Sequence, residues 1–126
     1  MKLHTLSLAV LTFALSPLAQ ALETKPFNQA EFSQAQTAGK STALHFHADW
    51  CPTCKKQSAS LEQLKADKAL DITVFVANYD SEKALKQKYA VRTQSTLIVF
   101  KGDVEKTRLA GQTDASDIKT ALIKGL

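Results

Sequence analysis

The pentapeptide Trp50-Cys51-Pro52-Thr53-Cys54 contains the only two cysteines of this 126-residue chain. It follows a short apolar stretch and precedes a stretch with helical spacing, so we expect it where a strand passes into a helix. Two cysteines at this spacing, in the first turn of a helix, can close into a small ring or open to two thiols. The pentapeptide therefore predicts a redox-active dithiol.

The residues around the dithiol predict different roles for the two thiols. Pro52 lacks an N–H and has φ near the helical value, which suits the first position of a helix. Cys51 then lies at the N-cap, where unpaired amides and the helix dipole favour the thiolate and lower its pKa. We expect Cys51 to be the exposed nucleophile. Cys54, one turn further on, is expected to be more shielded and to act as the resolving thiol.

Two other interpretations of the cysteines stay open. A purely structural disulfide would close so short a loop that it contributes only about 2 kcal/mol. A copper or zinc site could combine Cys51 and Cys54 with His45 or His47, although closed zinc sites usually take histidines at wider spacing on a helix. Both alternatives explain the position of the pentapeptide less well than thiol chemistry does.

The N-terminal segment predicts export. Lys2 precedes an apolar run from Leu6 to Leu15 and the small-residue triplet Ala19-Gln20-Ala21, which is typical of a secretory signal peptide cleaved after Ala21. The apolar run is shorter than the ~20 residues that span a bilayer. We expect residues 1–21 to be a signal peptide and residues 22–126 to form one domain in an oxidising space, a bacterial periplasm.

Charge and composition argue against nucleic-acid binding and indicate a single domain. The net charge of +4 falls to +3 when Lys2 is removed, and the lysines are scattered among acidic residues. No basic stripe with interleaved aromatic residues is present, so the sequence does not predict nucleic-acid binding. The hydrophobic content of 44% suffices for a single core. We expect a monomer that needs no cofactor.

Hydrophobic periodicity and capping signals predict alternating helices and strands. Asn28 and Glu31 match a capping box, Gly39 can end the first helix, and Asp114 with Asp117 is expected to cap the last one. The predicted helices are 29–38, 52–66, 81–89 and 115–124, and the predicted strands are 43–47, 71–77, 96–100 and 104–109. Strands joined through helices imply parallel pairing, and a turn at Gly102 adds one antiparallel edge strand. The fold class is therefore α/β, with a mostly parallel central sheet of about four strands between helices.

The order of elements and the run from Phe46 through Cys54 to Lys55 resemble the thioredoxin family. The resemblance covers Phe27 to Leu126, and the run from Val91 to Gly102 echoes the family's second half. It implies a thioredoxin fold with an extra N-terminal helix, Cys51 as the attacking thiol, Cys54 as the resolving thiol and Trp50 as a flat apolar neighbour that shapes the substrate surface. Ordinary core packing is the alternative role for Trp50.

The chain departs from the family at three places. Thioredoxins usually have a cis-proline facing the dithiol, whereas this chain has Ser95; a cis bond there would cost about 3 kcal/mol, so we expect a trans bond. Ser95 either offers its hydroxyl to Cys51 or is an unconstrained turn residue. The dipeptide Pro52-Thr53 replaces Gly-Pro and is expected to tune the reduction potential. His45 stands where many members bury an acid.

His45 has two possible roles. A base at this position would accept the proton of Cys54 during resolution, and histidine has a reference pKa near 6.5. Burial in an apolar strand would instead lower its pKa and keep the ring neutral. His47 is expected to be part of the wall around the dithiol.

The sequence thus predicts an exported thiol-disulfide oxidoreductase that acts on protein disulfides. The resemblance extends to the periplasmic domains of membrane reductant transporters, and the inserted helical domain of dedicated periplasmic oxidants is missing, which favours a reductase. A reductase in an oxidising space requires a source of electrons, so we expect a membrane-embedded thiol donor. The alternative from another class is a copper- or zinc-handling module.

Overall fold

The computed structural model describes residues 21–126, which form a five-stranded sheet and four helices. The strands are β1 (Glu23–Pro26), β2 (Ser41–His47), β3 (Thr73–Asn78), β4 (Thr96–Lys101) and β5 (Val104–Ala110). The helices are α1 (Gln29–Thr37), α2 (Pro52–Leu64), α3 (Lys83–Lys88) and α4 (Ala115–Ile123). The predicted signal peptide lies outside the described residues except for Ala21. None of the helices in the described part of the chain is long and apolar enough to span a bilayer.

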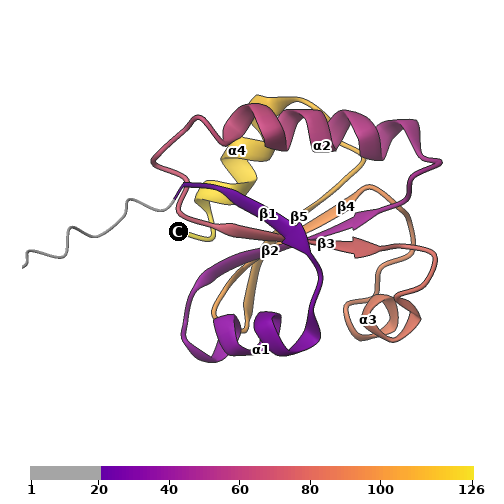
Figure 1. The fold of residues 1–126 in the computed structure, drawn as a ribbon, viewed down its shortest axis with the longest axis horizontal. Helices are drawn as coiled ribbons and strands as arrows, with labels where there is room; N and C mark the ends of the chain where they lie inside the picture. Colours follow the sequence, from indigo (N-terminus) through magenta and orange to yellow (C-terminus); the bar gives the residue numbers. More distant parts are fainter. Residues whose placement is uncertain (1–20) are drawn as a thin grey trace, which may run out of the picture.

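The sheet separates two layers of helices. α2 and α4 cover one face, and α1 and α3 cover the other (Figure 1). Successive residues of β2 and β4 point to opposite faces, as strand geometry requires, so Ala43 packs under α2 and α4 whereas Leu44 packs on the side of Phe32 in α1. The predicted α/β thioredoxin fold, with helices on both faces of the sheet, is confirmed.

The strand order β1-β3-β2-β4-β5 corrects two details of the prediction. β1 is an additional edge strand, parallel to β3, which four residues ending in Pro26 did not signal. β4 pairs antiparallel with β2, so the sheet is mixed rather than mostly parallel. Asn78 at the end of β3 and Thr96 at the start of β4 pair with adjacent residues of β2. The six-residue α3 spans only about 9 Å, too little to return the chain to the other end of the sheet.

The predicted elements are otherwise present, with bounds that differ by at most two residues. Asn28 Oδ1 accepts a hydrogen bond from the amide of Glu31 at 3.0 Å, which starts α1. Gly39 follows α1 with φ at +70°, a conformation that glycine adopts without strain. Asp114 occupies the N-cap of α4 but its side chain makes no capping hydrogen bond, so that part of the prediction was wrong.

Candidate active site

The dithiol lies where the end of β2 passes into α2. Cys51 is the N-cap of α2, with extended backbone angles of φ −93° and ψ 112°, and Pro52 is the first helical residue. The amide of Cys54 donates to Cys51 Sγ at 3.1 Å, in the way that a capping side chain accepts from the first turn. The helix start predicted from Pro52 is therefore confirmed.

The two thiols are free and differ little in exposure. Cys51 is 2% exposed and Cys54 is completely buried. The predicted order of shielding is correct, but Cys51 is not the open thiol that its N-cap position suggested. The reason is the loop before β4, which places Ser95 Oγ 3.2 Å from Cys51 Sγ. Both cysteines pack with Ala48, and Tyr79 packs against this cluster.

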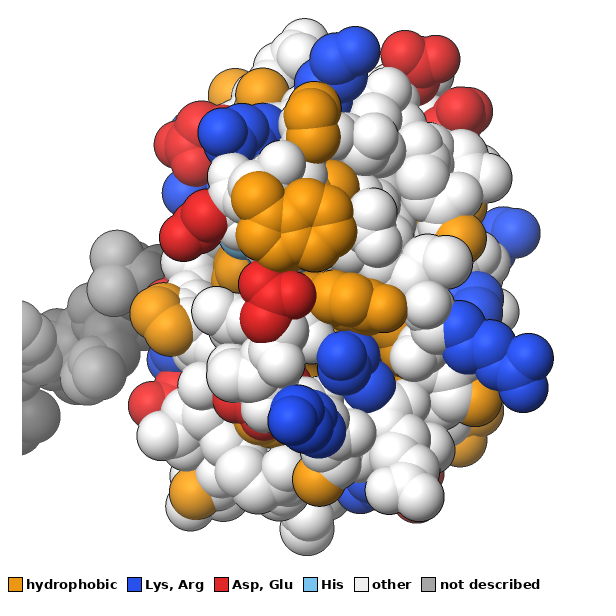
Figure 2. All heavy atoms as spheres, turned by 90° about the vertical axis from the view of Figure 1, so that its right-hand side faces the viewer, with side chains coloured by type: hydrophobic (Ala, Val, Ile, Leu, Met, Phe, Trp, Pro, Cys, Tyr) orange, Lys and Arg blue, Asp and Glu red, His pale blue; other side chains and the backbone are white. Residues whose placement is uncertain are grey.

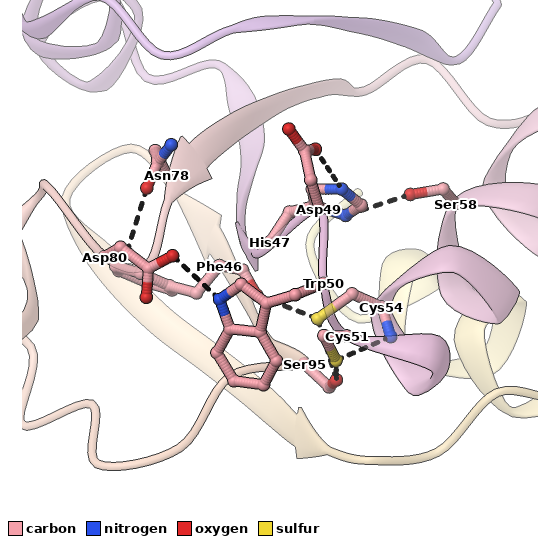
Figure 3. Close-up of polar contacts among 10 residues, drawn as sticks. All are labelled: Phe46, His47, Asp49, Trp50, Cys51, Cys54, Ser58, Asn78, Asp80 and Ser95. Carbon is pink, nitrogen blue, oxygen red and sulfur yellow. Dashed lines mark hydrogen bonds and ion pairs between the residues drawn. The ribbon is translucent and has the colours of Figure 1, made fainter.

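Ser95 occupies the position facing the dithiol and contacts both sulfurs. Its Oγ lies 3.2 Å from Cys51 Sγ and 3.0 Å from Cys54 Sγ (Figure 3). The Gln94–Ser95 bond is trans, as expected. Ser95 has φ at +62°, which costs a residue with a side chain about 1–2 kcal/mol. Of the two roles considered for Ser95, the structure supports the hydroxyl near Cys51.

These contacts split the acidities of the two thiols. Burial alone would raise the pKa of Cys51, but hydrogen bonds from the Cys54 thiol, the Ser95 hydroxyl and the amides of Cys54 and Thr53 outweigh it and lower that pKa. Burial raises the pKa of Cys54, and the neighbouring Cys51 sulfur raises it further. The arrangement therefore favours one thiolate, on Cys51, beside one protonated thiol.

Trp50 forms an exposed apolar surface beside the dithiol. Its side chain is 59% exposed, which excludes core packing. The indole Nε1 donates to Asp80 Oδ2 at 2.8 Å, and Asn78 Oδ1 accepts from the amide of Asp80 (Figure 3). The face of the molecule at the start of α2 shows hydrophobic side chains at its centre, with acidic and basic groups around them (Figure 2). A tryptophan held in this way can contact another protein without rearranging.

His45 is buried and neutral, and it makes no hydrogen bond to either sulfur. Burial lowers its pKa to about 4, partly offset by its hydrogen bond to Gln57. Nε2 lies 2.9 Å from Gln57 Oε1, and Nδ1 is buried without a partner. Cys54 Sγ instead contacts Ser95 Oγ and, at 3.9 Å, the carbonyl of Phe46. The structure thus supports a packed, neutral histidine. It shows no hydrogen bond between His45 and Cys54 that would support the proton-carrier role.

Gln57 is a site residue that our sequence analysis missed. It is buried on α2, on the same helix face as Cys54, Leu61 and Leu64. Its amide nitrogen donates to the carbonyls of Ser95 and Gln112, both at 2.9 Å. The signal was present in the sequence, because a glutamine at an inward-facing helical position requires buried partners.

His47 lies at the rim of the site and binds other side chains. Its ring contacts Asp49 Oδ1 at 3.2 Å and Ser58 Oγ at 3.4 Å (Figure 3). Within residues 21–126 no group of three or more histidine, cysteine or acidic side chains is arranged to hold a metal ion. His45 Nε2, the ring nitrogen that has a hydrogen-bond partner, faces Gln57. The geometry therefore gives the copper or zinc alternative no support.

Comparison with known proteins agrees with this site. Residues 23–124 match the thioredoxin family model. Thioredoxin-2 of Saccharomyces cerevisiae is 32% identical over 94 residues, which cover 74% of this chain and 88% of the yeast protein. Thioredoxin of Chlamydia trachomatis is 32% identical over 97 residues, which cover 77% of this chain and 89% of that protein.

A solved structure extends the similarity to three dimensions. The crystal structure of Trxlp from Edwardsiella tarda has a TM-score of 0.75 and 39% identity to this chain, and the match covers 79% of this chain and 98% of the other. Cys51 and Cys54, separated by two residues, fit the two-cysteine site of such proteins. The chain belongs to the thioredoxin family of protein-disulfide oxidoreductases.

Proposed function

We propose that this protein is a periplasmic reductase of protein disulfides, in which Cys51 attacks and Cys54 resolves. The observation that carries the proposal is the contact of both sulfurs with one hydroxyl, at 3.2 and 3.0 Å, with Cys51 alone also accepting the amide of Cys54. Hydrogen bonds from the Cys54 thiol, the Ser95 hydroxyl and the backbone lower the pKa of Cys51, whereas burial raises the pKa of Cys54. A thiolate is the nucleophile in disulfide exchange, so Cys51 is the attacking group.

The reaction takes place in two exchanges. Cys51 thiolate attacks one sulfur of a substrate disulfide, forms a mixed disulfide and releases the other substrate sulfur as a thiolate. Cys54 then loses its proton and attacks Cys51 Sγ, which forms the Cys51–Cys54 disulfide and releases the second substrate sulfur. The substrate gains two electrons and two protons; this protein gives up two electrons and the proton of Cys54, and solvent supplies the second proton. A membrane-embedded thiol donor returns it to the dithiol form.

The direction of electron flow is supported by the fold. The segment between β3 and β4 contains only the six-residue α3, without the inserted helical domain of dedicated periplasmic oxidants. Relatives that match the chain are thioredoxins. The reduction potential of thioredoxin, about −270 mV, lies at the reducing end of the range known for dithiol proteins. These features favour a reductase, and a reductase in an oxidising space depends on a donor of electrons.

Equilibration of the Cys51/Cys54 pair with glutathione buffers tests the direction. We expect a reduction potential more negative than about −230 mV, because the pair should resemble other reductants of this fold. Alkylation of free thiols followed by mass measurement gives the oxidised fraction. A reduction potential of about −120 mV, typical of strong oxidants, would overturn the reductase proposal and leave the exchange chemistry intact.

The proposed location has its own test. Expressed as the full chain in a Gram-negative host, the protein should be recovered from the periplasmic fraction with Leu22 as its first residue. Mass spectrometry of the intact protein distinguishes this from a chain that retains residues 1–21. Recovery of the full-length chain from the cytoplasm would contradict export.

Replacement of Trp50 tests the substrate surface. Trp50→Ala should lower kcat/KM toward a protein disulfide about tenfold, the effect of one aromatic anchor at an interface. Exchange with a small disulfide such as oxidised glutathione should stay within about twofold, since it needs no docking surface. Val104 is a matched control, because it is similarly exposed, at 56%, and lies at the other end of the sheet. Equal losses for both substrates would show that Trp50 acts on the dithiol instead.

A further inference from the structure

We propose that Gln57, hydrogen-bonded to His45, is a positioning residue that holds the Ser95 hydroxyl against both active-site sulfurs. The inference rests on the roles proposed above for Cys51 and Cys54. It assigns to a buried pair on α2 and β2 the task of shaping the loop before β4. Neither His45 nor Gln57 hydrogen-bonds to a sulfur, so Gln57 acts through Ser95.

The hydrogen bonds of Gln57 fix its orientation. Its amide nitrogen lies 2.9 Å from two carbonyl oxygens, those of Ser95 and Gln112. Carbonyls only accept, so the NH2 group must face them and Oε1 must face His45. Oε1 also only accepts, and His45 Nε2, 2.9 Å away, must therefore carry the ring proton. The two carbonyls thus fix the orientation of the Gln57 amide, and the Nε2–H of His45 satisfies its oxygen.

Ser95 needs such support because its backbone is strained. A serine with φ at +62° persists only where its surroundings determine the conformation. Its N–H donates to the carbonyl of Phe46 at 2.9 Å, and its carbonyl accepts from Gly111 N–H at 3.0 Å and from Gln57 at 2.9 Å. Gln57 is the only side chain among these partners. It ties the loop to the helix that carries both cysteines.

The position of the hydroxyl suits both halves of the reaction. With Cys51 ionised, the single hydroxyl proton of Ser95 is donated to Cys51 Sγ, while Cys54 keeps its own proton. When Cys51 is in the mixed disulfide and Cys54 loses its proton, rotation about the Cβ–Oγ bond turns the same proton toward Cys54 Sγ. One hydroxyl thereby stabilises each thiolate in turn, provided that the loop holds it between them.

A double-mutant cycle on Ser95 and Gln57 tests the proposal. The acid dissociation constant of Cys51 is obtained from its alkylation rate as a function of pH in the reduced full-length protein. Ser95→Ala should lower this constant about tenfold, the effect of one hydrogen bond to a charged group. Gln57→Met, which keeps the length of the side chain but makes no such bonds, should lower it about three- to tenfold. In the Ser95→Ala background, Gln57→Met should cause no further change beyond about twofold.

Ser60→Ala is the matched control. Ser60 Oγ donates to the carbonyl of Thr113, so this variant also removes a bond from α2 to the neighbouring loop but does not touch Ser95. It should leave the acid dissociation constant of Cys51 within about twofold of the wild type. Where Gln57→Met is too unstable to purify, Gln57→Asn keeps the amide but shortens its reach, and it should shift the constant in the same direction.

Two results would overturn the inference. One is an unchanged Cys51 constant in both Gln57 variants, and the other is an undiminished effect of Gln57→Met in the Ser95→Ala background. The titratable side chains in or against the cluster that contains Cys51 are Cys54 and Tyr79, and His45 is connected to the site through Gln57. All three are unchanged in these proteins. Failure of the proposed function is distinguishable, because it would appear in the reduction potential of the Cys51/Cys54 pair or in the location of the protein, which the Gln57 and Ser95 variants do not decide.

Discussion

Cys54→Ser will trap this protein on its substrate as a mixed disulfide. The second exchange needs a sulfur held beside Cys51, and an intramolecular thiol has an effective concentration far above that of any dissolved thiol. An external thiol also has poor access, since Cys51 is only 2% exposed. Turnover should fall roughly a thousandfold. A covalent complex should appear on non-reducing electrophoresis and should be separated into its two proteins by dithiothreitol.

The reciprocal variant is the control for this trap. Cys51→Ser should form no complex, because the remaining thiol is buried and its pKa is raised. Its turnover should be lost to at least the same degree. If Cys51→Ser were the variant that captured the substrate, the attacking and resolving roles assigned to the two cysteines would be reversed.

His45 will make the protein less stable as the pH falls from about 6.5 to about 4. The unfolded chain protonates this ring near its ordinary pKa of 6.5, whereas burial keeps the folded ring neutral down to a pKa of about 4. The unfolded state therefore binds more protons in this interval, and the free energy of unfolding decreases as the pH falls. The full loss, reached below about 4, is roughly 3 kcal/mol. Urea unfolding of the reduced protein at pH 7 and pH 4 measures it.

His45→Gln isolates this contribution, because a glutamine offers an N–H to Gln57 but does not titrate. Most of the loss attributed to His45 should disappear in this variant. Its ion pairs from Asp67 to Lys119 and from Glu105 to Arg108 are the same as in the wild type, so their acid sensitivity cancels in the comparison. An identical pH dependence of the two proteins would show that the pKa of His45 is the same in the folded and unfolded states.

Most of the fold could be predicted because its signals are local. Asn28 and Gly39 bracket α1, Pro52 starts α2, and Gly102 turns β4 into β5. The direction of β4 could not be obtained in this way. The direction of β4 depends on which end of the sheet the chain has reached after the short α3. This is set by the path of the chain in space and not by the periodicity of the sequence. β1 was missed because four residues that end in proline do not alternate clearly.

The candidate site divides in the same manner. The N-cap position of Cys51 and the nearness of Ser95 follow from spacing and family resemblance, and both are present. The burial of Cys51 and the role of Gln57 depend on contacts between residues 38 to 55 positions apart in the chain. Such contacts leave only a weak trace in a single sequence, here a polar residue on an apolar helix face.

Trp50 gives the molecule a built-in optical reporter. It is the only tryptophan of the chain, so all indole emission arises from one ring that immediately precedes the reactive sulfur. A disulfide quenches excited indole more strongly than two thiols do, and its closure at Cys51 changes the surroundings of this ring. The brightness of the unlabelled protein should therefore follow its oxidation state in real time, without a dye or a coupled enzyme.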